Sequence, residues 1–186
     1  MRPLIMWNMV TLDGFFEGSK PWDIDFHSAG WGDDLEQLSL DQLASTDLLV
    51  FGRKTYEGMA AYWTTATGEI AEFMNSIPKL VFSHTLQSAD WNNTRLVTTD
   101  AADEIRPLKQ QDGKAMFVLG SAELSASLMQ AGLFDEYRIG LNPIVLGGGN
   151  PLFKTLPRSV RLQLLEARPL KTGCVLLRYR PLDEAS

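Results

Sequence analysis

Apolar residues in this 186-residue chain gather in short runs that polar segments separate. Runs of this length, bounded by turn-forming residues, predict buried strands rather than isolated helices. We predict such strands at Leu4–Val10, Leu48–Phe51, Lys79–Ser83 and Ala115–Gly120, with a shorter and weaker candidate at 95–98. An apolar strand without polar alternation is typical of a sheet that is covered on both faces.

Two other segments carry apolar residues at helical spacing. Leucines between Asp33 and Leu43 recur at helical offsets and acids occupy the first turn, so a helix is expected to begin near Asp33. Another helix is expected at 121–131, directly after a predicted strand. Alternation of strands and helices predicts an α/β fold with a mostly parallel central sheet and helices on both faces.

The C-terminal part of the chain has a different pattern. A further strand region at 136–145 is broken by Pro143. Two later apolar runs, 162–167 and 175–179, flank Lys171-Thr172-Gly173 and predict an antiparallel hairpin at one edge of the sheet. There is no internal repeat or linker, and we expect a single domain over 1–186.

Composition excludes several functions. The net charge is −6 without a cluster of lysines or arginines, which argues against a nucleic-acid partner. No apolar run approaches membrane-spanning length and the N-terminus has no cleavage pattern, so we expect no membrane partner and a cytoplasmic location. A single cysteine, Cys174, and two separated histidines predict neither a disulfide nor a metal site.

Polar residues or glycines follow four of the predicted strands, at Asn8–Gly14, Gly52–Thr55, Ser83–Thr85 and Gly120–Leu124. Because ligands of open α/β sheets bind at the carboxyl ends of strands, these four segments are expected to line one crevice. Gly52-Arg53-Lys54-Thr55 is the strongest of them. A glycine and two cations at a strand-to-helix junction suit a phosphate group.

Each of these segments also has a structural interpretation. Gly52 suits a tight turn, Ser83-His84-Thr85 suits a turn with side-chain hydrogen bonds, and Ser121 suits a helix N-cap. The run at 147–149 is consistent with either a phosphate cradle or a bare glycine loop. Neither a GxGxxG fingerprint nor a Walker A motif occurs.

Asp34 is the candidate catalytic acid, because it lies at a helix start between an aromatic-rich segment and the phosphate-type motif. The alternative is that Asp33 and Asp34 only complement the helix dipole. The segment from Phe15 to Gly32 is long and irregular, and its aromatics are consistent with packing or with a lid over a ligand.

In their order and spacing, these motifs resemble the dihydrofolate reductase superfamily, and more closely its branch related to the C-terminal reductase domain of the riboflavin-biosynthesis protein RibD. The segments that carry the resemblance extend over almost the whole chain: 8–14, 51–57, 79–83, 118–124, 134–137 and 143–153. The resemblance implies a three-layer dihydrofolate reductase-like fold. The glycine-containing segment at 143–153 is closer to the riboflavin branch than to folate reductases.

The resemblance also implies a function. It implies an NADPH-dependent oxidoreductase that transfers a hydride to a C=N or C=O group of a small heterocyclic, pterin- or pyrimidine-ribityl-like substrate. In such an enzyme the cofactor-binding residues would be Val10 and Thr11 near the nicotinamide; Gly52, Arg53, Lys54 and Thr55 at phosphates; Ser83, His84 and Thr85 near the 2′-phosphate; and Gly120, Ser121, Ala122, Glu123 and Leu124 at the pyrophosphate.

Two alternatives to this function remain open at the level of sequence. One is a non-catalytic NADP(H)-binding protein that retains the reductase fold, and the other is a hydrolase whose Ser, His and acid converge from distant segments. Dimers are common in the riboflavin-type branch, and the hairpin near Cys174 offers an edge for pairing. We therefore expect a homodimer.

Overall fold

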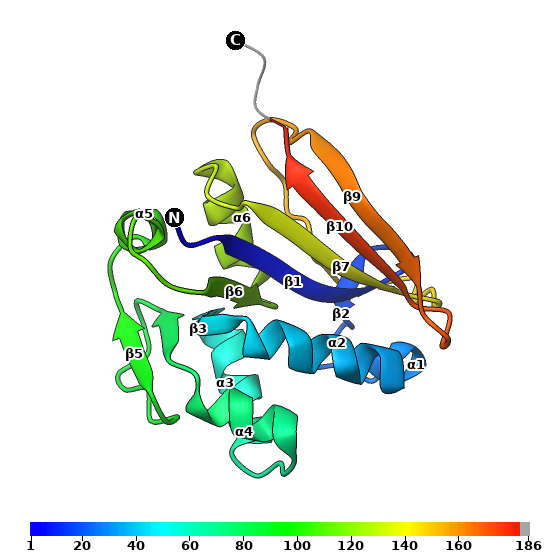
Figure 1. The fold of residues 1–186 in the computed structure, drawn as a ribbon, viewed down its shortest axis with the longest axis horizontal. Coiled ribbons are helices and arrows are strands. Elements are labelled where there is room, and N and C mark those ends of the chain that lie inside the picture. Colours follow the sequence, from blue (N-terminus) through cyan, green and yellow to red (C-terminus); the bar gives the residue numbers. More distant parts are fainter. Residues whose placement is uncertain (183–186) are drawn as a thin grey trace.

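The computed structural model describes residues 1–182 and has three layers, with one mixed sheet between two layers of helices (Figure 1). The eight strands of the sheet follow the order β5-β4-β3-β6-β1-β7-β10-β9. Their bounds are β1 Leu4–Thr11, β3 Thr46–Gly52, β4 Lys79–Phe82, β5 Thr94–Val97, β6 Ala115–Leu119, β7 Glu136–Asn142, β9 Leu162–Pro169 and β10 Val175–Pro181. The predicted domain reaches 186, so its last four residues lie outside the described residues.

All strand pairs from β5 to β7 are parallel, whereas β10 runs antiparallel to both β7 and β9. The predicted parallel sheet and the predicted antiparallel edge hairpin are therefore confirmed. Strand β7 ends at Asn142, because Pro143 has no N–H to donate to a neighbouring strand. A small second sheet pairs β2 (Phe15–Glu17) with β8 (Asn150–Pro151).

Six helices occur among the described residues: α1 His27–Gly30, α2 Asp33–Ala44, α3 Arg53–Trp63, α4 Glu69–Ser76, α5 Ala101–Lys109 and α6 Ala122–Gln130. The predicted helices correspond to α2 and α6, and α3 begins directly after Gly52, at the predicted strand-to-helix junction. The local pattern did not place α4 and α5. Helix α5 is preceded by the N-cap residue Asp100, whose carboxylate accepts hydrogen bonds from two first-turn amides, and it contains Pro107.

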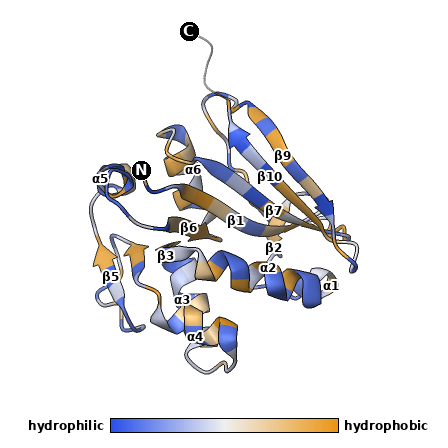
Figure 2. Ribbon diagram, in the orientation of Figure 1, coloured by the Kyte–Doolittle hydropathy of each residue, from blue (hydrophilic) through white to orange (hydrophobic). Residues whose placement is uncertain are grey.

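Strand β1 shows how the core is divided between the two layers. Leu4, Met6 and Val10 pack on the side of α5 and α6, whereas Ile5 and Met9 pack on the side of α2, α3 and α4. Figure 2 shows that β1 and β6 are mostly hydrophobic, as expected for central strands that are covered on both faces. No helix within residues 1–182 combines the length and apolar character needed to span a membrane.

Candidate functional site

The carboxyl ends of the central strands bring three of the predicted segments together. Gly52 at the end of β3 is in register with Phe82 of β4, and Val50 is in register with Val118 of β6. Segments 52–55, 83–85 and 120–124 therefore follow adjacent strands at one edge of the sheet. This is the edge at which open α/β sheets bind ligands.

Two hydrogen bonds fix the start of helix α3 beside the start of α6. The Gly52 amide donates to Ser121 Oγ at 2.9 Å, and the Ser121 amide donates to Thr55 Oγ1 at 2.9 Å. Ser121 Oγ in turn donates to the Leu119 carbonyl at 3.0 Å. The Ser121 side chain therefore joins the two segments and makes no cap hydrogen bond to its own helix, although Ser121 occupies the N-cap position.

The turn before α6 has an unusual backbone. Gly120 and Ser121 both have left-handed conformations, with φ of +58° and +59°. A Cβ on Gly120 would lie 2.8 Å from Thr55 Cγ2, so a side chain at this position is excluded by both conformation and space. The close approach of the Thr55 side chain to the Gly120 backbone explains why the sequence places glycine there.

Neither α3 nor α6 has a side-chain cap hydrogen bond at its amino end. The first amides of an α-helix have no intrahelical acceptor and carry the positive end of the helix dipole. Two such ends side by side form a region that accepts anionic oxygens. The donors therefore suit the oxygens of a phosphate group.

Arg53 and Lys54 add full positive charges to this region. Arg53 forms an ion pair with Glu57 on the next turn of α3, with 3.1 Å between Nη1 and Oε2. Both side chains are about half exposed, so the pair is weak and a phosphate can compete for the guanidinium. Lys54 is exposed, and no residue within 1–182 forms an ion pair with it.

Ser83 adopts the predicted turn at the end of β4. Its hydroxyl accepts hydrogen bonds from the amides of Thr85 at 3.1 Å and Leu86 at 3.0 Å. His84 and Thr85 remain exposed beside the start of α3. The structural interpretation therefore holds for Ser83, while its two neighbours are free to contact a ligand.

Val10 and Thr11 lie at the carboxyl end of β1, but both are buried. The Val10 carbonyl accepts a hydrogen bond from Asn142 Nδ2 at 3.0 Å, and the Thr11 hydroxyl donates to Asp13 at 2.6 Å. The Thr11 hydroxyl and, to a lesser degree, two loop amides stabilise the Asp13 carboxylate and lower its pKa. Those amides belong to Leu146 and Gly147.

The glycine run at 147–149 is held in place by contacts with the segment that follows β1. The Gly147 amide donates to Asp13 at 2.8 Å, and a Cβ on Gly149 would lie 2.5 Å from the Glu17 carbonyl oxygen. An amide that already binds a carboxylate is not available to a phosphate. The geometry favours the bare-loop interpretation of 147–149.

Asp34 lies in the first turn of α2 and faces the hairpin between β9 and β10. Its Oδ2 accepts a hydrogen bond from the Lys171 amide at 3.1 Å, and its Oδ1 lies 3.5 Å from Lys171 Nζ. The backbone hydrogen bond is the largest cause that lowers the pKa of Asp34 below its usual value. Asp34 is therefore ionised at neutral pH.

Comparisons with known proteins show the family of this chain. The model of the RibD C-terminal domain family matches residues 2–176. The chain belongs to the RibD C-terminal domain family. YyaP of Bacillus subtilis (strain 168), itself uncharacterised, is 30% identical to it, with 96% of this chain and 94% of YyaP covered.

Two solved structures show how far the fold of this RibD C-terminal domain is shared. One, from Shewanella sp. PV-4, has a name that refers to riboflavin biosynthesis; it superposes with a TM-score of 0.79 at 22% identity and covers 97% of this chain and 99% of its own. The other is dihydrofolate reductase of Enterococcus faecalis in complex with NADP(H), with a TM-score of 0.65, 15% identity and 97% of each chain covered. The fold is therefore dihydrofolate reductase-like.

In this RibD C-terminal domain, the segment from Phe15 to Gly32 contains strand β2 and helix α1 and reaches helix α3. Phe26 is buried, Trp31 is 45% exposed, and the Trp22 ring packs against α3 at Gly58. In helix α1, burial lowers the pKa of His27 to about 4, so its imidazole is neutral. Trp22 thus lies against the helix that follows Gly52.

Sequence reasoning missed Asn142, the last residue of β7. Its side chain is fully buried, and Nδ2 donates to the carbonyls of Val10 at 3.0 Å and Gly140 at 3.3 Å. Its Oδ1 has no hydrogen-bond donor and lies close to Gly30 of α1. The signal was a polar residue at the end of an apolar strand, immediately before Pro143.

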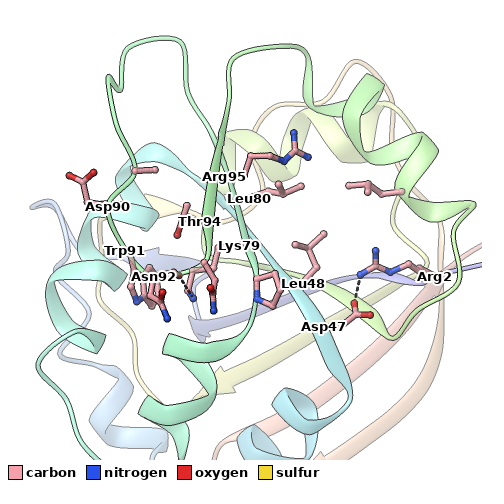
Figure 3. A pocket seen from close by; sticks show the side chains of 14 residues that line it. Arg2, Asp47, Leu48, Lys79, Leu80, Asp90, Trp91, Asn92, Thr94 and Arg95 are labelled. Carbon is pink, nitrogen blue, oxygen red and sulfur yellow. Dashed lines mark hydrogen bonds and ion pairs between the residues drawn. The ribbon is translucent and has the colours of Figure 1, made fainter.

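A separate cavity of about 900 Å³ lies at the other end of the strands, among the amino ends of β3, β4 and β5. Figure 3 shows Arg2 bound to Asp47 in its wall and Lys79 beside Trp91 and Asn92. The buried Lys79 ammonium donates to the carbonyls of Ile77 at 2.8 Å and Asn92 at 3.0 Å. Burial lowers the pKa of Lys79 to about 8. None of the predicted site residues lines this cavity.

Proposed function

We propose that this chain is an NADPH-dependent oxidoreductase that transfers a hydride to a C=N or C=O group of a small heterocyclic substrate of the pterin or pyrimidine-ribityl type. The observation that carries the proposal is the pairing of two uncapped helix starts through Gly52, Ser121 and Thr55. Membership of a reductase-domain family supports it. The NADP(H) complex of the enterococcal reductase, which shares the fold, is consistent with this cofactor.

Each helix start has a separate task in this proposal. The amides at the start of α6 bind the pyrophosphate, while Arg53, Lys54 and the α3 amides bind phosphate oxygens, including the adenosine 2′-phosphate. His84 and Thr85 lie beside α3 on the next strand and contact the same end of the cofactor. A cation-rich end favours NADPH over NADH, which lacks the 2′-phosphate.

When bound, the cofactor supplies the hydride from its nicotinamide C4. The protein binds and orients it, excludes water with segment 15–32 and positions the substrate near the carboxyl ends of β1 and β7. Val10 and Thr11 form a rigid surface at the end of β1. The Val10 carbonyl and the Thr11 hydroxyl are already hydrogen-bonded within the fold. We propose that Asp34 assists protonation by orienting a water molecule, because an ionised carboxylate accepts hydrogen bonds.

A titration with NADPH and NADH tests the proposal, followed by calorimetry or by tryptophan fluorescence. Arg53→Ala should weaken NADPH binding by about 10- to 100-fold, because a hydrogen bond to a charged group contributes about 1.5–3 kcal/mol. NADH affinity should change much less. Arg161→Ala, which removes an equal charge from an exposed position before β9, is the matched control. Equal losses for both dinucleotides would contradict the assignment of Arg53 to the 2′-phosphate.

One observation favours a second candidate function. Asp34 is bound to Lys171 of the hairpin, so the hydrogen-bonding capacity of the candidate catalytic acid is partly used. A non-catalytic NADP(H)-binding protein would show saturable NADPH binding without turnover of any C=N or C=O substrate. Turnover assays with pterin and pyrimidine substrates distinguish the two.

We also propose a homodimer and a cytoplasmic location. Leu164 and Leu165 of the edge strand β9 are 51% and 45% exposed, and the outer edge of β9 has no partner among the described strands. A second copy of the chain is the simplest partner for such an edge. The free, buried Cys174 is compatible with a reducing compartment.

A further inference from the structure

The indole of Trp22 lies directly on the backbone of helix α3. A Cβ built on Gly58 would come within 2.2 Å of Trp22 Cε3 and 2.5 Å of Cδ2, so the ring occupies the space in which any other residue would carry its side chain. Glycine within a helix is less favourable than alanine. The position of the indole, which we call its seat, explains why this helical position carries glycine.

This seat is close to the proposed phosphate region. Gly58 follows Thr55 by three residues and Lys54 by four, and residues at these spacings share one face of a helix. The indole therefore covers α3 about one turn beyond the helix start that carries Arg53 and Lys54. A ligand group that extended from this start along the Gly58 face of α3 would meet the indole.

The backbone of Trp22 has a left-handed conformation, with φ of +62°, which is uncommon for a bulky residue. Two hydrogen bonds stabilise it. The Trp22 amide donates to Glu17 Oε1 at 2.6 Å, and the Gly18 amide donates to the Asp23 carbonyl at 2.8 Å. The turn that presents the indole is therefore held from Glu17 and Gly18, at the end of β2.

Glu17 also binds strand β8. Its Oε2 accepts a hydrogen bond from Asn150 Nδ2 at 3.0 Å, and Asn150 accepts from Lys154. Lys154 lies 3.6 Å from Glu123 in the first turn of α6. A single carboxylate thus connects the Trp22 turn with β8 and, through Lys154, with the start of α6.

We propose that Trp22 is a gate on the ligand cleft, closed when its indole rests on Gly58 and held closed by Glu17. The entry of a ligand along α3 requires the indole to leave this seat, after which it can stack on a planar ring of the ligand. The part of the proposal that concerns a ligand rests on the proposed function. The seat on Gly58 and the role of Glu17 do not depend on it.

The free protein tests the seat. In protein labelled with 5-fluorotryptophan, Trp22→Phe assigns the fluorine resonance of Trp22. Gly58→Ala places a methyl group in the seat and should shift this resonance towards that of an exposed indole. Gly148→Ala is the matched control, because a Cβ there meets nothing within 4 Å. An unchanged Trp22 resonance in Gly58→Ala would overturn the proposal.

Stability supplies a second measurement that does not depend on a resonance. Gly58→Ala should raise the melting temperature in a Trp22→Ala background, where the helix gains from alanine and no ring is displaced. The same change in the native background should raise it less or lower it. Equal effects in both backgrounds would show that the two residues are not coupled and would contradict the seat.

Glu17→Gln tests the role of the carboxylate at nearly constant volume. A glutamine side chain has one acceptor oxygen, so its NH₂ group must face either the Trp22 amide or the Asn150 NH₂, both of which are donors. We expect faster hydrogen exchange at the Trp22 amide in this variant. Unchanged exchange would remove Glu17 from the proposal.

Stopped-flow binding of NADPH then tests the gate. If the closed seat limits entry, Gly58→Ala should raise the association rate by at least about threefold, since the competent state becomes more populated. The Trp22 resonance of the native protein should also move on binding. Binding at an unchanged rate with an unmoved Trp22 would overturn the gate and leave the proposed function standing. Absence of NADPH binding in both the native protein and Gly58→Ala would overturn the proposed function and the gate together. The Trp22 resonance of the free protein would still test the seat on Gly58.

Discussion

Ser121 donates its backbone amide to the Thr55 hydroxyl across 2.9 Å, and this bond joins the starts of two helices that are 66 residues apart in the chain. The partner bond from the Gly52 amide to Ser121 Oγ closes the arrangement. Because the Thr55 hydroxyl accepts from the left-handed turn at Ser121, it fixes the direction of the first amides of α6. The geometry of the proposed phosphate region thus depends on two small side chains.

Thr55→Val should separate this role from simple packing. Valine keeps the shape of threonine but leaves the buried Ser121 amide without an acceptor, which costs about 1–3 kcal/mol of the free energy of unfolding. Thr55→Ser, which retains the hydroxyl, should lose less. Urea denaturation measures both variants, and a loss in Thr55→Val no larger than that in Thr55→Ser would show that the hydrogen bond contributes little.

Asp34→Asn tests the proposed catalytic contribution. Removing the carboxylate should lower kcat by about 100-fold or more if it orients a water for protonation, while NADPH affinity stays unchanged. Lys171→Ala, which leaves the carboxylate in place, is the control and should lower kcat much less. Unchanged turnover in Asp34→Asn, accompanied by a lower melting temperature, would restrict Asp34 to anchoring the hairpin.

Lys79 makes a pH-dependent contribution to stability. Its pKa is about 8 in the folded protein, against a usual value of 10.5, because burial disfavours the ammonium. Between these values the unfolded chain binds more protons, so the free energy of unfolding rises with pH in this window. The difference between wild type and Lys79→Met, measured by urea denaturation from pH 7 to 10.5, should shift in favour of wild type. A constant difference would mean that the pKa is not lowered.

The unpaired outer edge of strand β9 leads us to predict a homodimer. Light scattering on the wild-type protein should give twice the chain mass of 20.7 kDa. Leu164→Lys introduces a charge at an exposed position of the edge and should shift the mass towards 20.7 kDa without a large change in stability. Tyr62→Lys, at an exposed position of α3, is the control. A monomeric wild type would contradict the proposal.

Local sequence patterns were sufficient for the sheet and for the meeting of the strand ends. Apolar runs placed the central strands, and parallel pairing then required Gly52 and Gly120 to lie at the same edge. The same patterns did not show that Ser121 binds Gly52 rather than its own helix. That contact depends on how closely two turns approach, which periodicity does not encode.

The least predictable contacts link residues that are distant in the chain and lie in irregular segments. Asp34 binds Lys171 across 137 positions, and Trp22 rests on Gly58. Both involve segments without a repeating pattern, so their positions depend on side-chain packing that only the folded chain reveals. The aromatic composition of 15–32 indicated a covering segment but did not identify which ring would meet α3.

The position of the bound cofactor tests the central claim most directly. In a two-dimensional amide spectrum of the nitrogen-15-labelled protein, titration with NADPH should move the resonances of Arg53, Lys54 and Thr55 together with those of Ala122, Glu123 and Leu124. Both sets should saturate at the same concentration. Saturable shifts at the cavity around Lys79 and Trp91, with both helix starts unmoved, would contradict the claim that the paired starts of α3 and α6 bind the cofactor phosphates.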